Sequence, residues 1–294
     1  MANLGIPSNT IEILQKYDFN FRKQFGQNFL IDTRVLDKIV EASGICKDDC
    51  VLEIGPGIGT LTQYLAEKAA KVIAVEIDKN LIPILEDTLS AYDNITVLNQ
   101  DILKTDIKSL TEKYNESKPI KVVANLPYYI TSPIVMELLE GEAPIDTITV
   151  MVQKEVADRM CTGPGSKDYG ALSLGVQYYS KPEIVAFVPQ NCFIPRPKIG
   201  SSVIKLTKYR DKPVTTTNPE LMFQLIKSSF TQRRKTLANG IMMGKNAGLN
   251  NLEIKTRKEL EERLEQAGFP KDIRGEKLTL QEWAALTDLL VTVL

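Results

Sequence analysis

The sequence predicts an α/β fold in which a mostly parallel sheet is covered by helices and followed by a small all-helical domain. Five short, β-branched-rich segments alternate with helical patterns over the first 160 residues or so. The first of these segments runs directly into a glycine-rich turn, Gly55-Pro-Gly-Ile-Gly59, and no strand pattern occurs beyond residue 217. Strands that alternate with helices form parallel sheets with right-handed crossovers.

The periodicity of apolar residues gives the individual elements. Strands are expected at Val51–Ile54, Lys71–Glu76, Ile95–Leu98, Ile120–Ala124 and Thr147–Val152, and two late strands at Glu183–Val188 and Ser202–Tyr209. Helices are expected at Thr10–Tyr17, Thr33–Ser43, Thr60–Ala70, Leu81–Ser90, Pro133–Glu140 and Lys154–Met160. Ala171–Tyr179 could be a helix or a strand, and its pattern favours a helix.

The carboxyl-terminal part is predicted to be helical and follows a charged and Pro/Thr-rich linker. Asn218-Pro219 is a good N-cap and first-turn pair for a helix that continues to Ser229. Thr256-Arg-Lys-Glu259 and Thr279-Leu-Gln-Glu282 are capping boxes that precede apolar stripes. We therefore expect a catalytic α/β domain over residues 1–209 and a helical domain over residues 210–294.

Composition excludes several classes of protein. Among 294 residues, 43% are hydrophobic and 25% charged, with no apolar run long enough for a membrane span and no signal-peptide pattern, so we expect a cytoplasmic protein. Cys46 and Cys50 resemble half of a zinc site, but no second pair completes it, so no metal site is expected. The absence of histidine excludes Ser-His-Asp and Cys-His catalysis.

The net charge of −1 conceals an uneven distribution. Between Lys205 and Lys245 there are nine Lys or Arg residues against two acidic residues, so the rest of the chain is acidic. A basic stripe on an acidic body is typical of a polyanion-binding surface, although a solvated helix face would have the same charges. Arg233, Arg234 and Lys235 are the candidates for contacts with RNA.

The glycine-rich turn predicts a ligand site, because a buried strand that ends in such a turn at a helix N-terminus is how open α/β sheets bind nucleotides. Its spacing is neither the Gly-x-Gly-x-x-Gly of a dinucleotide site nor that of a P-loop. Glu53, beside the turn, would repel a pyrophosphate but tolerate a cationic ligand. These features favour S-adenosylmethionine, which carries an ammonium and a sulfonium, over NAD.

Polar residues follow the next three strands in order: Glu76, Asp101 and Asn125. Ligands in open α/β sheets bind outside the carboxyl ends of the strands. Glu76 lies about twenty residues after the turn, the distance at which a carboxylate accepts ribose hydroxyls. Asp101 could accept a hydrogen bond from an adenine amine. Each acid alone could equally be a helix cap or a solvated carboxylate, but together they favour a cofactor that contains adenosine.

Asn125-Leu-Pro-Tyr128 indicates the reaction. The lone pair of an exocyclic base amine is delocalised into the ring, which makes its methylation difficult. The side-chain oxygen of Asn125 and a nearby backbone carbonyl could accept both N–H groups and turn the lone pair toward a methyl donor, which is catalysis by orientation. Tyr128 could stack on a base taken out of its helix.

The chain resembles the KsgA-type ribosomal RNA adenine dimethyltransferases. The matching motifs, in order over about the first 240 residues, are Phe25-Gly-Gln-Asn-Phe-Leu, Glu53-Ile-Gly-Pro-Gly-Ile-Gly-Thr-Leu-Thr, Val75-Glu-Ile-Asp, Gln100-Asp, Asn125-Leu-Pro-Tyr-Tyr-Ile-Thr-Ser-Pro, Gln153-Lys-Glu-Val-Ala, Tyr169-Gly-Ala-Leu-Ser, Phe193-Ile-Pro-Arg-Pro and Phe230-Thr-Gln-Arg-Arg-Lys-Thr-Leu.

The resemblance implies a class I, Rossmann-like methyltransferase fold that uses S-adenosylmethionine. It implies as substrate two adjacent adenines in a hairpin loop near the 3′ end of 16S ribosomal RNA, each converted to N6,N6-dimethyladenine, by a protein acting as a monomer. The helical domain would bind RNA or the ribosome. The positions that match the family's cofactor-binding residues are Asn28, Leu30, Gly55, Glu76, Asp101 and Asn125, and those that match its catalytic residues are Asn125, Pro127, Tyr128 and Phe193.

Phe193 matches the aromatic residue that helps to clamp the target base opposite Tyr128. One departure from the family pattern is Gly200, where Asp is expected, and it leaves the packing of this loop open.

Two alternatives remain. The large-subunit adenine methyltransferases of the macrolide-resistance type share the glycine turn and the catalytic tetrapeptide, although Leu126 and Tyr129-Ile-Thr-Ser-Pro133 favour the small-subunit group. A non-catalytic ribosome assembly factor on the same scaffold is the second alternative, and the intact tetrapeptide argues against it.

Overall fold

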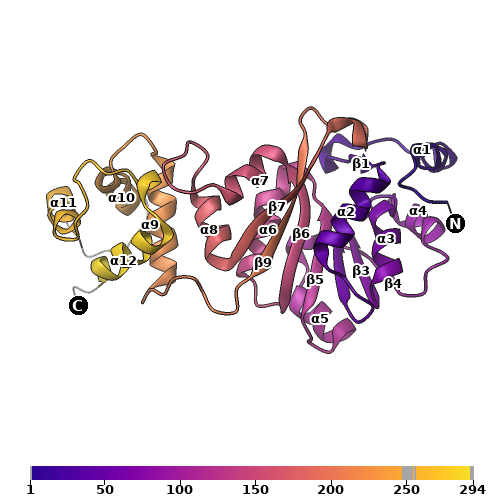
Figure 1. Cartoon of the computed structure of the whole chain (residues 1–294), viewed down its shortest axis with the longest axis horizontal. Helices are drawn as coiled ribbons and strands as arrows, with labels where there is room; N and C mark the ends of the chain where they lie inside the picture. Colours follow the sequence, from indigo (N-terminus) through magenta and orange to yellow (C-terminus); the bar gives the residue numbers. More distant parts are fainter. Residues whose placement is uncertain (1, 247–253, 255, 292–294) are drawn as a thin grey trace. The chain divides into compact units, whose positions relative to one another are not determined.

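The computed structural model of the 294-residue chain describes residues 2–246, 254 and 256–291 (Figure 1). It contains two compact units. The α/β unit comprises Met1–Ala157 and Ser180–Lys208, and the helical unit comprises Asp158–Tyr179 and Tyr209–Leu294. None of the helices in the described part of the chain has the length and apolar character that a membrane span requires.

The α/β unit is built on a seven-stranded sheet with the order β4-β3-β2-β5-β6-β9-β7. Its strands are β2 (Cys50–Ile54), β3 (Lys71–Glu76), β4 (Ile95–Asn99), β5 (Ile120–Asn125), β6 (Ile145–Gln153), β7 (Ser180–Val188) and β9 (Ser201–Lys208). The first five strands are parallel, whereas β9 lies antiparallel to both β6 and β7. All seven predicted strands are present, and the mostly parallel sheet is confirmed.

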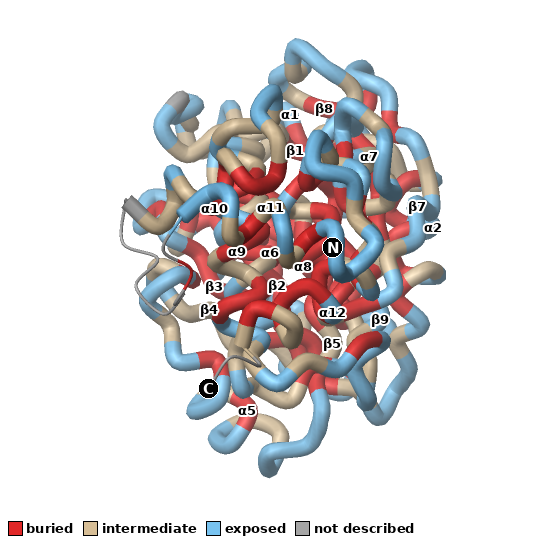
Figure 2. Tube along the Cα trace, turned by 90° about the vertical axis from the view of Figure 1, so that its left-hand side faces the viewer, coloured by how far each residue is buried: buried red, intermediate tan, exposed pale blue. Residues whose placement is uncertain are grey.

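The central strands have apolar residues on both faces because helices cover both faces of a parallel sheet. Every residue of β2 is buried, and Figure 2 shows β2 and β3 in red. Val51 packs in one cluster with side chains of α2 and α3, and Leu52 and Ile54 point to the opposite face. This continuous burial explains why the sequences of these strands are largely apolar and do not alternate between apolar and polar residues.

The helices of the first part of the chain follow the predicted pattern, with one addition. They are α1 (Pro7–Lys16), α2 (Thr33–Ser43), α3 (Thr60–Lys68), α4 (Ile82–Thr88), α5 (Ile107–Asn115), α6 (Thr131–Glu140) and α7 (Lys154–Cys161). The prediction did not include α5. Only Ile107 and Thr111 of this helix are buried, so its sequence carries little of the apolar periodicity by which helices are recognised.

A second, two-stranded sheet was also not predicted. Strand β1 (Phe29–Leu30) pairs antiparallel with β8 (Phe193–Ile194), and Leu30 lies opposite Phe193. Two-residue strands have no periodicity to detect, and their pairing joins segments more than 160 residues apart. The pairing fixes the amino-terminal segment beside the main sheet.

The order of the strands creates a switch point between β2 and β5. From β2 the chain builds outward through β3 and β4, and it then returns to the other side of β2 to form β5 and β6. At such a point the connections diverge and leave a crevice outside the carboxyl ends of the strands. The glycine turn after β2 and the end of β5 at Asn125 therefore border the same crevice.

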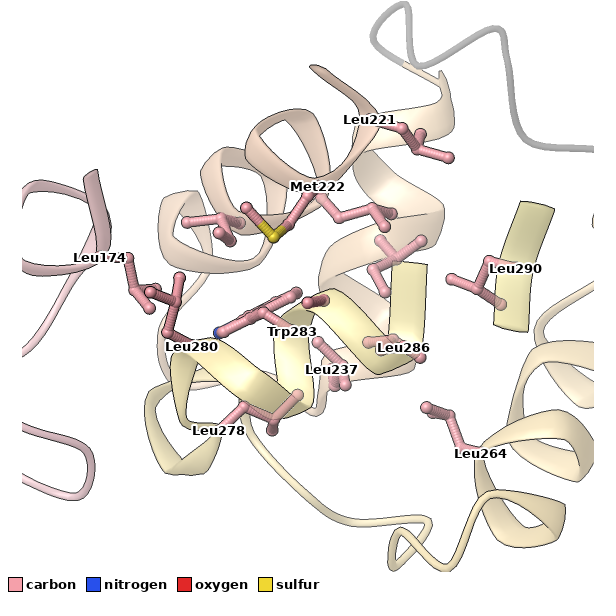
Figure 3. Close-up of a cluster of buried hydrophobic side chains, with 14 of the residues drawn as sticks. Leu174, Leu221, Met222, Leu237, Leu264, Leu278, Leu280, Trp283, Leu286 and Leu290 are labelled. Carbon is pink, nitrogen blue, oxygen red and sulfur yellow. The ribbon is translucent and has the colours of Figure 1, made fainter. Parts of the chain in front are cut away.

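The helical unit consists of α8 (Ala171–Tyr179), α9 (Pro219–Thr231), α10 (Leu237–Asn246), α11 (Arg257–Gln266) and α12 (Leu280–Val291). Trp283 is completely buried at the centre of its apolar cluster (Figure 3). Thr279 and Glu282 form the predicted capping box, since each backbone N–H is accepted by the other's side chain.

The predicted division between residues 209 and 210 needs a correction. The observed change from one unit to the other after Lys208 is close to it, but the helical unit also includes residues 158–179. Leu174 and Tyr178 of α8 are buried among the side chains of the carboxyl-terminal helices. Residues 158–179 therefore contribute to the core of the helical unit. A single boundary in the sequence cannot separate the two units.

Helix α10 was missed because it contains Gly240 and Gly244, and glycine is a poor helix former. Both glycines serve close packing against α9. A Cβ at Gly240 would lie 3.0 Å from the Cα of Ser229, and a Cβ at Gly244 would collide with Ser228. The two helices approach each other at these positions.

Leu264→Ala should lower the free energy of unfolding of the helical unit by about 2–5 kcal/mol, because the completely buried side chain would leave a cavity. Trp283 is the chain's single tryptophan, so chemical denaturation followed by its fluorescence reports on this unit. Lys258→Ala, at an exposed position of the same helix, is the control and should leave the transition unchanged. Equal transitions for the two variants would contradict the assigned role of Leu264.

Candidate active site

A cavity lies at the carboxyl edge of the parallel strands and encloses about 990 Å³ of space, part of it open to solvent. Its walls come from the amino-terminal segment, the glycine turn and the ends of β3, β4 and β5. The predicted site residues that line it are Asn28, Leu30, Gly55, Glu76, Asp101, Asn125, Pro127 and Tyr128. The structure therefore brings together all the predicted cofactor residues, which are spread over almost 100 positions of the sequence.

The glycine turn has the backbone conformation that its sequence indicated. Gly55 and Gly57 have φ values of 68° and 63°, which L-residues with a Cβ rarely adopt. A Cβ at Gly55 would meet no protein atom within 4 Å, so it would project into the open cavity. The backbone N–H of Gly55 donates to the carbonyl of Val75 at 2.9 Å, which fixes the turn to β3. A ligand can therefore approach this backbone closely.

Glu76 holds the turn from the end of β3. Its carboxylate accepts a hydrogen bond from the backbone N–H of Gly57 at 3.3 Å and another from that of Asp78 at 2.8 Å. The side chain is buried, and burial raises the pKa of Glu76 to about 7. The carboxylate is thus positioned by the backbone and ready to accept hydrogen bonds from a ligand.

Glu53 is buried at the end of β2, and one oxygen of its carboxyl group lacks a hydrogen-bond partner. Its residue is 1% exposed, and its Oε2 makes no hydrogen bond to any residue that the structure describes. Burial, together with the nearby charge of Glu76, raises the pKa of Glu53 to about 8. A buried acceptor without a partner is costly, and a cationic or hydrogen-bond-donating ligand would relieve this cost.

Asp101 caps a short helix and also lies at the cavity, so the two interpretations of this residue do not exclude each other. Its Oδ1 accepts from the backbone N–H of Leu103 at 3.1 Å and so caps the short 3-10 helix Ile102–Lys104. Its Oδ2 lies 3.7 Å from the ammonium of Lys104. The residue also lines the cavity and remains partly exposed, so its carboxylate is accessible to a ligand amine.

The amino-terminal segment closes one side of the cavity through contacts that the sequence did not reveal. The Gln27 amide donates to Oδ2 of Asp78 at 2.9 Å, and its oxygen accepts from the backbone N–H of Arg22 at 2.8 Å. The Arg22 guanidinium lies 3.5 Å from Oδ1 of Asp78. Gln27 belongs to the Phe-Gly-Gln-Asn motif, which was the only local signal, whereas its partner is 51 residues away.

Asn125 and Tyr128 are both fixed by hydrogen bonds from other parts of the unit. Nδ2 of Asn125 donates to the backbone carbonyl of Asn28 at 3.0 Å, which leaves Oδ1 as an acceptor. The Tyr128 hydroxyl is 2.6 Å from the hydroxyl of Ser201 at the start of β9. The amide oxygen and the aromatic ring are therefore held at the same end of the cavity.

The position of Phe193 does not agree with the predicted contact with a base. Its side chain is 1% exposed, and it is absent from the residues that line the cavity. Instead it pairs with Leu30 and packs with Val188 and Cys192. In this conformation Phe193 supports the wall formed by β1 and cannot touch a substrate.

Arg233 also requires a correction. Its guanidinium donates to the carbonyl of Lys167 at 2.6 Å and forms an ion pair with Glu276 at 3.1 Å, so it joins two segments of the helical unit. Arg234 and Lys235 are exposed and form no ion pair with any residue in the described part of the chain. Only these two of the three candidates are available for a phosphate. Sequence alone could not separate them, because the three are consecutive.

The comparison with known families decides the assignment. Residues 18–266 match the family described as Ribosomal RNA adenine dimethylase. The chain belongs to this family. A relative from Lachnoclostridium phytofermentans, named Ribosomal RNA small subunit methyltransferase A, is 62% identical over 292 residues, which cover 99% of this chain and 98% of the relative. A relative of the same name from Clostridioides difficile is 48% identical, with coverage of 99% and 98%.

Solved structures support the same family. A dimethyladenosine transferase from Plasmodium falciparum has a TM-score of 0.72 at 27% identity, covering 88% of this chain and 95% of that one. The 23S rRNA methyltransferase ErmE has a TM-score of 0.67, also at 27% identity, with coverage of 90% and 99%. The fold is that of the S-adenosylmethionine-dependent methyltransferases, as predicted.

The cofactor of this family is S-adenosylmethionine, and the cavity suits it. The carboxylate of Glu76 would accept the ribose hydroxyls, and Asp101 would accept from the adenine amine. Glu53 lies beside the turn, where a bound cation would favour its ionised form, and the carboxylate would in turn stabilise the cationic part of the cofactor. Among the described residues, no group of three or more acidic, Cys or His side chains could hold a metal ion.

Glu76→Ala should weaken the binding of S-adenosylmethionine at least tenfold, since two charge-assisted hydrogen bonds to ribose would be lost. Titration calorimetry with the purified protein measures the dissociation constant directly. Glu86→Ala, at an exposed position of α4, is the matched control and should bind as the unaltered chain does. Unchanged affinity in the Glu76 variant would exclude the ribose assignment.

The stability of the unliganded protein should fall as the pH rises from about 4.5 to about 8. Because the pKa of Glu53 is about 8 in the folded chain, the folded state binds more protons than the unfolded state over this interval. When one group titrates in this way, the free energy of unfolding falls by at most roughly 1.4 kcal/mol per pH unit. Denaturant titrations at several pH values should show a shallower decline for Glu53→Gln, which cannot ionise. If the unaltered chain and Glu53→Gln lost stability in parallel as the pH rises, the raised pKa of Glu53 would be refuted.

Proposed function

We propose that this protein transfers methyl groups from S-adenosylmethionine to the N6 amines of two adjacent adenines in a hairpin loop near the 3′ end of 16S ribosomal RNA, to give N6,N6-dimethyladenine. The observation that carries the proposal is the orientation of Asn125, whose Nδ2 is occupied by the carbonyl of Asn28. Its Oδ1 is therefore the atom available to an amine in the cavity.

The proposed mechanism depends on two acceptors for the two N–H groups of the adenine. One is Oδ1 of Asn125, and the other is a backbone carbonyl of the Asn-Leu-Pro-Tyr segment. When both N–H groups are held, the nitrogen lone pair leaves conjugation with the ring and points toward the methyl donor. The bound cofactor supplies an electrophilic methyl group on its sulfonium. The protein contributes orientation, which needs no histidine and no general base, because the methylated nitrogen is a strong acid and releases its proton to water.

Tyr128 would hold the base through its ring rather than through its hydroxyl. The hydroxyl is already engaged with Ser201, which fixes the ring at the cavity wall. Stacking of a base on an aromatic ring is worth about 1–3 kcal/mol and requires the adenine to leave its helical stack. Pro127 limits the backbone of this segment, so the ring and Asn125 keep a constant spacing.

The relatives favour the small-subunit assignment over the large-subunit alternative. Relatives named as small-subunit enzymes are 47–62% identical over nearly the whole chain, whereas ErmE is 27% identical. The predicted cofactor residues all line one cavity of a single chain, so the site that we propose needs no residue from a second copy. A purely non-catalytic assembly role is not favoured, because the Asn125 and Tyr128 geometry is intact.

We further propose that the helical unit binds RNA phosphates. Arg210, Lys227, Arg234 and Lys235 are exposed on it. Lys212 is less suited, since its ammonium lies 4.1 Å from the centre of the Tyr179 ring. A cationic surface of this kind binds phosphates without reading sequence.

Asn125→Ala and Tyr128→Ala should each reduce methyl transfer at least a hundredfold, while Tyr128→Phe should retain most of it because the ring remains. The assay incubates unmethylated small subunits, with large subunits in parallel, with labelled S-adenosylmethionine and maps the modified adenines. Cofactor binding to Tyr128→Ala is measured as a control for folding. Label in large-subunit RNA would reject the small-subunit assignment, and near-normal turnover of Asn125→Ala would reject the orientation mechanism.

A further inference from the structure

A second, shallow depression lies at the carboxyl end of β7 and encloses about 540 Å³ of space, much of it open to solvent. It is lined by Phe187, Pro189, Gln190, Asn191, Arg196 and Gly200. The residue Phe187 is 57% exposed, an unusual state for a phenylalanine. Because β7 and β6 are both antiparallel to β9, this end of β7 lies at the same edge of the sheet as the main cavity.

Gly200 creates the space for the Phe187 ring. A Cβ at Gly200 would lie 2.8 Å from two carbons of that ring, so any larger residue would displace it. Glycine at this position therefore lets the ring lie against the backbone.

The depression is cationic at its rim. Arg196 and Lys198 are exposed, and no carboxylate is among the lining residues. The Gln190 amide donates to the carbonyl of Lys198 at 2.6 Å, which closes the loop that carries both cations. An aromatic ring beside a guanidinium and the side-chain amide of Asn191 suits a nucleotide, whose base can stack while its phosphate is neutralised.

The depression is also linked directly to the main site. Gly200 precedes Ser201, whose hydroxyl contacts that of Tyr128. The Cα atoms of consecutive residues are about 3.8 Å apart. A nucleotide bound at Phe187 is therefore separated from the catalytic tyrosine by the start of one strand.

We propose that the depression binds an unpaired nucleotide of the substrate RNA near the target adenine, with its base on the ring of Phe187 and its phosphate at Arg196. The proposal rests on the proposed function, since it places a second nucleotide of the same RNA. A second reading is an apolar contact with a protein, because Ile184 and Val185 are also exposed on β7. The cations and amides around Phe187 favour RNA, and the experiment separates the two.

The test measures steady-state methylation of unmethylated small subunits. Phe187→Ala and Phe187→Leu should both raise KM for the subunit by roughly 5- to 150-fold, because neither residue can stack on a base. Phe187→Trp should retain the KM of the unaltered chain. Gly200→Asp should also raise KM, since it displaces the ring and adds a negative charge. Ile184→Ala, on the same strand, should have no effect.

Calorimetric binding of S-adenosylmethionine verifies that each variant is folded. A KM for Phe187→Ala within twofold of the unaltered chain would overturn the proposal. Retained KM in Phe187→Leu together with a raised KM in Ile184→Ala would also overturn it, because these effects identify an apolar protein contact. If the unaltered chain methylates no small-subunit adenine, the proposed function itself has failed, which is a separate result.

Discussion

Two carboxyl groups buried at the ends of adjacent parallel strands are the constraint around which this site is built. Glu53 and Glu76 both have raised pKa values because burial disfavours their charged forms. A sheet of buried apolar strands tolerates such groups at its edge, where the glycine turn approaches and the backbone N–H of Gly57 donates to the carboxylate of Glu76. The positive φ values of the glycines allow that approach. The burial of these two carboxyl groups therefore links the edge of the sheet, the glycine turn and the binding of a cationic cofactor.

The amino-terminal segment connects this cofactor region with the methyl-accepting region. Asn28 lines the cavity, and its backbone carbonyl also accepts from Nδ2 of Asn125, which leaves Oδ1 of Asn125 as an acceptor. The same segment contacts Asp78 through Gln27, just beyond the strand that ends in Glu76. Binding of the cofactor and orientation of the amine thus share one short stretch of chain, so disturbance of either is expected to affect the other.

The sequence predicted what local pattern determines. Long apolar runs gave every strand of the main sheet, and residues directly after strand ends gave Glu76, Asp101 and Asn125. The sequence could not predict contacts between distant segments. One of these is the pairing of Leu30 with Phe193, which buries the phenylalanine ring. Arg233 was misassigned for the same reason, because its ion pair with Glu276 spans 43 residues. Charge patterns show how many cations a segment has, not which of them already have partners.

The contact of Arg22 and Gln27 with Asp78 has a consequence for repeated turnover. Dimethylation of one amine consumes two cofactor molecules, so the cavity has to release its product and refill between transfers. The Arg22 side chain is 43% exposed, but the side chain of Asp78 is completely buried, so separating the two would leave a buried carboxylate with fewer partners. Opening this wall of the cavity would therefore carry an energetic cost, which each exchange of the cofactor through it would have to meet.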